Sequence, residues 1–539
     1  MPTRNHEFSR SFRALLRSNW QLEATALFDS QSLTEDNFVL RTGAVSEYVA
    51  SILGPVTGTD PYGLGLNSYS PNYSAFYTPL TSGQYSALTG RALNTSSTRE
   101  LIFRTQLTNP ALLRMRSGDV GVALVGEIGL EGWAYHPDPG IGRGDFLGFT
   151  AVGDSSADRN RQALTAEMRS PLTRLINMDI SGRFDRYRYS SQAFQKPTFN
   201  LGIEYAPLSN LAVHGRVGVA FRAPSLADEA QGLSGAYGAA TDFYKCVLAG
   251  FSIDNTLGCP YPLGGLANLL TVGNPDLQPT TASTTEFGVR WSPVSSTTID
   301  VGVRHWAIRD EVHQKSVVAI LRLEAECRLG LLPADSMACR EAISEVTRSP
   351  VSGASLSVLV PKINVSREDV TALTASVMFE YSLGGYGDLH ADFLVNDTLK
   401  HTRQVYPDGL GADVLALPFL RQEFKVAANG TLTWTRNAWS HSLSSFMQGT
   451  TPNYIAANSI NGYAAKGAGD LPEWWTFNWS SSYQFSPRLQ LAVSVANVLN
   501  AMPPVDPGTP GYSSVPFNSL AYNAYGRMFR ASLRYGIRQ

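Results

Sequence analysis

The strongest constraint on the fold of this chain is an alternation of apolar and polar residues that recurs along its length. In INMDISGRFD, residues 176–185, apolar side chains occupy one set of alternate positions and polar side chains the other. The same pattern occurs in residues 211–222, 489–496 and 526–539. Successive side chains of a β-strand point to opposite faces, so these segments are predicted to be strands with one apolar and one polar face.

The connections between the predicted strands are of two kinds. Residues 223–279 and 311–350 are long connections, and the second has a helical pattern. Other connections are very short turns that contain proline, which is typical of links between antiparallel neighbours. Because the two kinds alternate, all long connections should leave from one end of the strands. The short turns lie around Pro171, Pro207, Pro293 and Pro487.

The predicted strands are long for a soluble sheet. Many exceed about ten residues, enough to cross a bilayer, whereas strands of soluble proteins usually have about five or six. Long strands with one apolar face, short turns at one end and long loops at the other are typical of an outer-membrane barrel. We therefore predict an all-β fold, an antiparallel transmembrane β-barrel of about 18 strands with long extracellular loops and short periplasmic turns.

Composition excludes several other classes of protein. Charged residues make up 16% of the chain, against about 25% in soluble domains, and no apolar run of about 18 residues predicts a transmembrane helix. A net charge of -2 gives no indication of nucleic-acid binding. The chain has no GxSxG, HExxH or P-loop motif, and its eight histidines do not cluster at metal-ligand spacing. We predict no enzyme activity, no metal site and no cofactor.

The four cysteines fall into two close pairs in the long connections, Cys246 with Cys259 and Cys327 with Cys339. Each pair could close a small loop, and two local pairs favour disulfides in an oxidising compartment. Four reduced thiols are the alternative.

Four segments resemble the TonB-dependent outer-membrane receptors, in that family's order and over essentially the whole chain. They are VGVAFRAPSLADE, GNPDLQPTTASTTEFGVRWSP, LQLAVSVANVLNAMPP and YGRMFRASLRYGIRQ. The first ends an outgoing strand, and the last resembles the family's closing strand. The positions that carry the resemblance are Phe221, Arg222, Ala223, Pro224, Asn274, Pro275, Leu277, Pro279, Glu286, Gly288, Gly526 and Arg527.

The resemblance implies a receptor that takes up a scarce nutrient, such as a siderophore, vitamin, carbohydrate or peptide, across the outer membrane of a Gram-negative bacterium. Family barrels have 22 strands and are filled by a plug. No signal peptide, TonB box or plug is recognised in this sequence, so residues 1–539 are expected to be a barrel domain that is incomplete at its N-terminus and inactive in transport without the plug. The implied partners are outer-membrane lipid, the barrel-assembly machinery, the nutrient, and the TonB complex acting through the plug.

Polar residues on the predicted strands are candidates for ligand contacts in the barrel lumen. The lumen-facing candidates are Asp179, Arg183, Asp185, His214, Arg216 and Arg222.

A passive outer-membrane diffusion channel is the alternative function, although such channels do not need the receptor segments.

Overall fold

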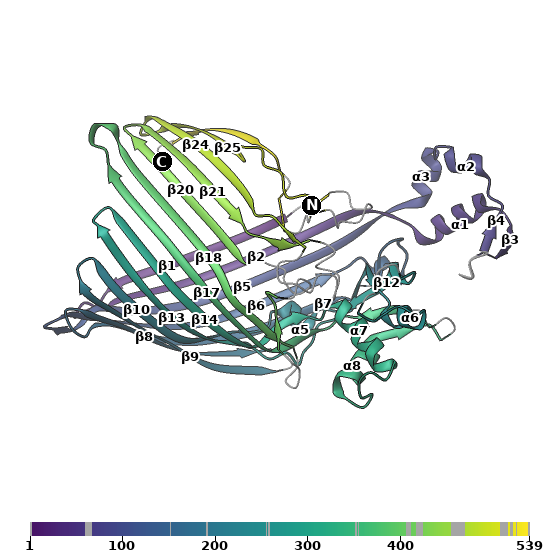
Figure 1. Ribbon diagram of the computed structural model, residues 1–539, viewed down its shortest axis with the longest axis horizontal. Helices are drawn as coiled ribbons and strands as arrows, with labels where there is room; N and C mark the ends of the chain where they lie inside the picture. The colour runs from purple at the N-terminus through teal and green to yellow at the C-terminus, as the bar shows by residue number, and fades with distance from the viewer. Residues whose placement is uncertain are drawn as a thin grey trace.

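A single antiparallel sheet of 18 strands dominates the computed structural model (Figure 1). The two-residue β19 (Ala412–Asp413) adds to β18, and the other 17 strands form one continuous series in chain order. This confirms the predicted fold class. The structure describes residues 3–59, 67–150, 152–189, 192–254, 256, 259–350, 353, 355–405, 411–416, 424–453, 469–506, 516–517, 521–523 and 525–536.

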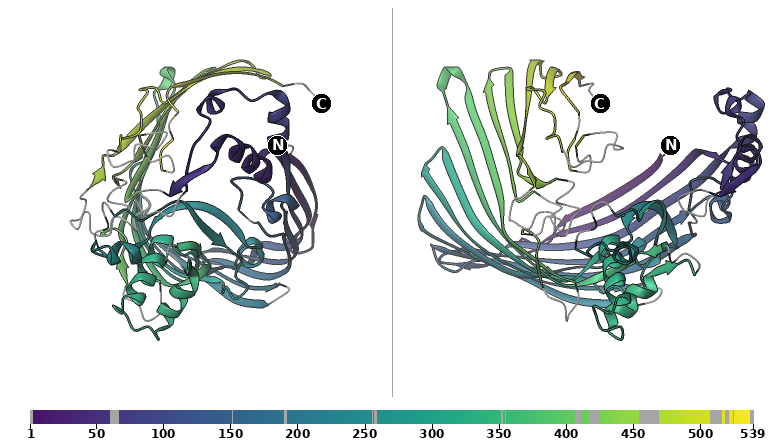
Figure 2. Two further views of the ribbon diagram at one scale, coloured as in Figure 1. Left: turned by 90° about the vertical axis from the view of Figure 1, so that its right-hand side faces the viewer. Right: turned by 45° about the vertical axis from the view of Figure 1, so that its right-hand side comes forward.

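Each strand of the series is antiparallel to the next, and the sheet curves into a deep trough (Figure 2). Among the described residues, no pairing joins the first strand to the last. The strands in order are β1 (Thr3–Leu15), β2 (Gln21–Leu40), β5 (Thr89–Met115), β6 (Gly118–His136), β7 (Ser155–Pro171), β8 (Ile176–Arg188), β9 (Ala193–Leu208), β10 (Leu211–Arg222), β13 (Thr280–Val294), β14 (Thr297–Gln314), β17 (Lys362–Ser382), β18 (Asp388–Gln404), β20 (Val426–Arg436), β21 (Trp439–Gln448), β24 (Trp474–Ser486), β25 (Leu489–Ala496) and β26 (Met528–Tyr535).

The register gives the sheet one apolar and one polar face, as the alternation predicts. Phe287 pairs with Val303 across β13 and β14, and these two side chains are 59% and 42% exposed. Glu286 and Arg304, which also pair, lie on the opposite face. A slip of one residue would exchange the two faces, so the apolar pattern fixes the register.

Short turns and long loops lie at opposite ends of the strands. The predicted proline turns link β7 to β8, β9 to β10, β13 to β14, and β24 to β25. At the other end, called here the loop end, α1 (Thr42–Leu53), β3 (Val56–Thr59), β4 (Asn67–Tyr69), α2 (Tyr73–Tyr77) and α3 (Ser82–Leu88) extend beyond β2 and β5 (Figure 1). None of the described helices has the length and apolarity needed to span a bilayer.

The remaining small elements of the fold are α4 (Pro139–Arg143), α5 (Leu226–Ala230), η1 (Gly384–Tyr386), β22 (Thr451–Pro452) and β23 (Asp470–Leu471).

The two long connections fold together into one compact unit at the loop end, called here the loop module. The first supplies β11 (Ser234–Thr241), α6 (Phe243–Leu248) and β12 (Pro262–Thr271). The second supplies α7 (Val317–Arg328), α8 (Met337–Glu345) and β15 (Val346–Arg348), which confirms the helical prediction, and β16 (Ser355–Leu359) follows it. Together they form a four-stranded sheet in the order β11-β12-β16-β15. Its buried core contains Phe243, Ile320, Leu321, Ala325, Val346, Val358 and Val360.

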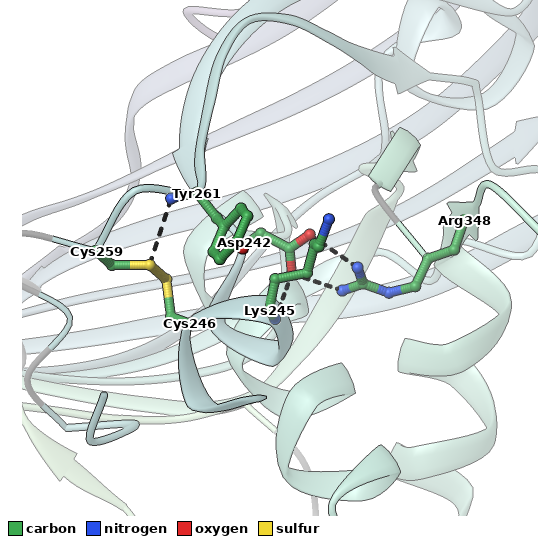
Figure 3. Close-up of a disulfide and its surroundings, with 6 residues drawn as sticks. All are labelled: Asp242, Lys245, Cys246, Cys259, Tyr261 and Arg348. Atoms are coloured by element: carbon green, nitrogen blue, oxygen red, sulfur yellow. Dashed lines mark hydrogen bonds and ion pairs between the residues drawn. A yellow bond between two sulfur atoms is a disulfide. The ribbon is translucent and has the colours of Figure 1, made fainter. Parts of the chain in front are cut away.

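Covalent and ionic links stabilise the loop module. Both predicted disulfides are present, Cys246–Cys259 in the first connection and Cys327–Cys339 in the second. Near the first disulfide, the guanidinium of Arg348 lies 2.8 and 3.0 Å from the two carboxylate oxygens of Asp242 (Figure 3). These ion-paired residues come from different connections, so the pair ties the two loops together.

We predict that Arg348→Met destabilises the loop module. Arg348 also donates to Glu324, and the side chains of Asp242 and Glu324 are 2% and 0% exposed. The change leaves the buried carboxylate of Asp242 without its cation, and Glu324 keeps only its pairing with Arg328. Breaking a buried pair in this way costs about 3–5 kcal/mol. Chymotrypsin should therefore cleave the module at least about a hundredfold faster, because cleavage follows the opening equilibrium. Arg367→Met, which removes an exposed partner of Asp369, is the control. Equal cleavage of the two variants would contradict this role for Arg348.

Candidate functional site

The FRAPS segment ends β10, and its backbone is held by a residue of β7 and by the residue that follows β8. The carbonyl oxygen of Pro224 accepts hydrogen bonds from Arg159 Nη1 and Tyr189 Oη, both at 2.7 Å. Arg159 also donates to Glu131, so a charged side chain positions the turn. Ser225 then caps α5 in a reciprocal capping box with Asp228. Strand β10 ends at Arg222 because the carbonyl of Pro224, two residues further on, is bound by side chains and Ser225 then starts a helix.

The GNPDLQP segment lies directly against this turn. Gly273 N donates to Gln231 O at 2.7 Å, and Asn274 N donates to Asp228 O at 2.9 Å. Asp228 is also paired with Lys362, the first residue of β17, and this contact holds the pKa of Asp228 below its usual range despite burial. Three separate parts of the chain thus meet at one point of the loop end.

The second half of GNPDLQP is fixed by side-chain amides. Gln192 Nε2 donates to Leu277 O at 3.2 Å, and the Leu277 side chain is fully buried. The amide of Asn364 bonds both the backbone N–H and the carbonyl of Gln278, each at 2.8 Å. Its Nδ2 also donates to Asp310 O at 2.7 Å. We call this set of contacts, from the Pro224 turn through residue 279 to the start of β17, the rim knot.

The remaining motif positions have local structural roles. Gly288 lies opposite His214, and a Cβ at Gly288 would be 2.4 Å from His214 Nε2. Glu286 is paired with Arg304 at 2.9 Å. Near the closing strand, Asn500 Oδ1 accepts from the backbone N–H of Arg527 at 2.9 Å. A side chain at the adjacent Gly526 would collide with that same oxygen, at 2.8 Å.

A network of charged side chains crosses β6, β7 and β8 on the polar face below the rim knot. Arg183 lies 2.7 Å from Asp185 and 2.8 Å from Glu127. Arg159 lies 2.5 Å from Glu131, and Arg161 is within 4 Å of both Glu127 and Glu131. Acidic and basic groups alternate across the strands, so the positive and negative charges of the network largely cancel.

The six predicted ligand candidates share this polar face but not one site. Arg183, Asp185 and Arg222 line a groove of about 500 Å³ together with motif residues 221 and 223. Asp179 lies 3.7 Å from Arg216, and His214 lies 3.9 Å from Glu286, so these three belong to strand-to-strand ion pairs elsewhere on the face. Of the six, Arg222 is the one whose side chain is exposed within the groove.

One group of residues was missed in the sequence. The fold brings Glu311 and His313 of β14 together with Glu368 of β17, where the sequence predicts no metal-ligating set. The available signal was local: a Glu and a His two residues apart on a strand point to the same face. The third member could not be found, because it is distant along the chain.

We predict that Gly273→Ala disrupts the rim knot. An added Cβ would lie 2.6 Å from both Gln231 N and Glu229 O, and these backbone atoms cannot move without breaking the knot. Overpacking of this kind costs about 1–3 kcal/mol. The variant should lose its heat-resistant electrophoretic mobility in detergent at a lower temperature than the parent. Gly182→Ala, where a Cβ meets nothing within 4 Å, should match the parent. Identical melting of all three proteins would refute the packing argument.

We also predict a pH dependence at the rim knot. Burial raises the pKa of Glu229 to about 7, opposed by the hydrogen bond from Gln192 and by Arg159. A raised pKa means that the neutral acid is favoured in the fold, so this contribution is complete below about pH 4.5, the ordinary pKa of Glu, and is lost as the pH rises through about 7. Between pH 5 and 8 the melting temperature should fall more in the parent than in Glu229→Gln, which stays neutral. A steeper fall in the variant would show that the sign is wrong.

Comparison with known proteins identifies the family. The model for TonB-dependent receptor-like β-barrels matches residues 3–498. A search of curated proteins finds no match.

Solved structures have the same fold at low sequence identity. A mutant of the ferric enterobactin receptor PfeA from Pseudomonas aeruginosa, in complex with enterobactin, is 14% identical with a TM-score of 0.60, over 99% of this chain and 62% of that protein. The siderophore receptor PirA from Acinetobacter baumannii is 14% identical with a TM-score of 0.57, over the same shares. The copper transporter OprC is 13% identical with a TM-score of 0.52, over 98% of this chain and 65% of OprC. The chain thus spans less than two thirds of the length of these proteins, and by its family match it belongs to the TonB-dependent receptor-like β-barrels.

Proposed function

We propose that this chain forms the barrel of a receptor that imports a scarce small-molecule nutrient across the outer membrane of a Gram-negative bacterium. The observation that carries the proposal is the rim knot, in which the FRAPS and NPDLQP segments join beside a groove with an exposed arginine. A receptor needs loops held rigidly above a polar interior, and this arrangement supplies them. The arrangement serves binding and transport, and we propose no enzyme activity for it.

The polar face of the sheet is proposed to line the lumen. Asp179, Arg183, Asp185, His214 and Arg216 would then face the interior, and Arg222 would contact ligand at the loop end. The apolar face would contact outer-membrane lipid, because unpaired polar groups are costly there. Insertion would require the barrel-assembly machinery.

Energy is proposed to reach the ligand through the TonB complex acting on a plug segment, as the family resemblance implies. On this proposal the barrel of residues 1–539 binds nutrient but does not transport it alone. The test should cover four classes of nutrient: siderophores, vitamins, carbohydrates and peptides. We place metal–siderophore complexes first, because an exposed arginine suits an anionic ligand.

The test measures surface binding and uptake separately. Cells with and without TonB express the chain and receive one labelled probe from each class: ferric enterobactin, cyanocobalamin, a maltooligosaccharide and a pentapeptide. We expect saturable binding of at least one probe and no accumulation in either strain. Non-saturable uptake at equal rates in both strains would instead establish a passive diffusion channel. Accumulation that requires TonB would contradict the need for a plug.

A matched pair of variants tests the groove. If the probe that binds is anionic, Arg222→Ala should weaken its binding about tenfold or more, since a charge-assisted hydrogen bond contributes about 1.5–3 kcal/mol. Arg367→Ala removes another exposed arginine, which lies on β17 and is paired with Asp369 of the same strand, and it should leave binding unchanged. Equal loss in both variants would indicate a non-specific charge effect and not a site.

A further inference from the structure

Three side chains of metal-ligand type lie together at the loop end of β14 and β17. One ligand atom from each of Glu311, His313 and Glu368 lies within 4.8 Å of the others. His313 Nε2 is 2.9 Å from Glu311 Oε2 and 3.9 Å from Glu368 Oε2. Ligands that share one zinc ion at about 2.0–2.2 Å are separated by about 3–4 Å. The group is therefore already near the spacing that a single ion imposes.

The backbone holds the first two ligands in place independently of their side chains. The preceding residue, Asp310, has φ 55°, a left-handed conformation that aspartate tolerates. Its carbonyl accepts from Asn364 Nδ2 at 2.7 Å and from Thr280 Oγ1 at 3.1 Å. Asp310 is thus fixed to β13 and β17, and this fixes where Glu311 and His313 begin.

Two polar atoms in the group are buried without a hydrogen bond. Within the part of the chain that the structure describes, Glu311 Oε2 and His313 Nε2 have no hydrogen-bond partner. They are also the two atoms that face each other at 2.9 Å. Buried polar atoms are nearly always satisfied. A bound cation would satisfy both atoms at once.

The third ligand is oriented from behind. Glu368 is only 5% exposed, and it accepts from Arg403 Nε at 2.9 Å, from Arg403 Nη2 at 3.0 Å and from His401 Nε2. Ligating carboxylates are commonly held by such outer hydrogen bonds. Two carboxylates and one guanidinium together contribute one net negative charge, which favours a divalent cation.

We propose that Glu311, His313 and Glu368 bind one divalent transition-metal ion, and that zinc is the ion their ligand set fits best. One imidazole nitrogen and two carboxylate oxygens are ligands that zinc accepts, with water completing the coordination. The ion would join β14 to β17 directly below the loop module. This site does not depend on the proposed import function, and either can fail without the other.

The test uses the full chain without a histidine tag, folded in detergent and stripped with a chelator. Zinc chloride is titrated by calorimetry, and cobalt chloride is followed by its visible absorption. We expect one equivalent of zinc, a higher melting temperature with zinc, and a cobalt spectrum of a nitrogen–oxygen site. Glu311→Gln and His313→Gln should each weaken binding more than about a hundredfold, because changes to outer partners alone cost about 10–100-fold.

His305→Gln is the matched control. His305 lies on the same strand and bonds Thr371 Oγ1 at 3.0 Å, outside the group, so zinc affinity should not change. Absence of bound zinc in the parent would overturn the proposal, and so would equal affinity in the parent and both ligand variants. The parent titration decides the question even if a variant fails to fold. In the first of these outcomes, Glu311 and His313 form an ordinary side-chain pair.

Discussion

A strand that crosses a bilayer must pair its backbone N–H and C=O groups with neighbouring strands, because no water is available to pair them. In the series of 17 strands, every strand between β1 and β26 meets this requirement by lying antiparallel between two neighbours. A crossing needs about 9–11 residues, and β5, with 27 residues, extends well beyond that length. The pairing requirement explains the short turns, since adjacent antiparallel strands need no crossover. The loops at the opposite end are free of the constraint, and that is where irregular structure accumulates.

Much of the sheet could be predicted because the sequence pattern that specifies it is local. Alternation at period two identifies strands and faces without reference to the rest of the chain, and the proline turns separate one strand from the next. The disulfides were also predictable, since each pair is only 13 or 12 residues apart. The joining of the two long loops was not predictable. It depends on contacts such as Arg348 with Asp242, which lie 106 residues apart and leave no periodic signal.

The difference between local patterns and contacts made in the fold also explains why the family could be predicted from sequence and the ligand could not. The motif segments of the rim knot are held through their backbone: Arg159 binds a carbonyl of the FRAPS turn, and Asn364 binds the N–H and carbonyl of Gln278. Gly273 is needed because any side chain there would meet backbone atoms. None of these roles depends on what the loops bind. The six candidate residues, by contrast, differ in whether they contact the groove or an ion-pair partner, which the alternation alone could not distinguish.

The rim knot also determines how the loop module is attached to the sheet. Strand β12 leads into β13 through GNPDLQP, and β16 leads into β17 through residues 360–361, where Val360 N donates to Leu270 O at 2.7 Å. Lys315, which follows β14, donates its backbone N–H to Pro361 O and pairs with Glu345 of α8 at 2.6 Å. All of these connections are hydrogen-bonded to one another. The module is therefore attached to the sheet through several hydrogen-bonded segments and not through a hinge. A force on its buried core would act on β13, β14 and β17 together.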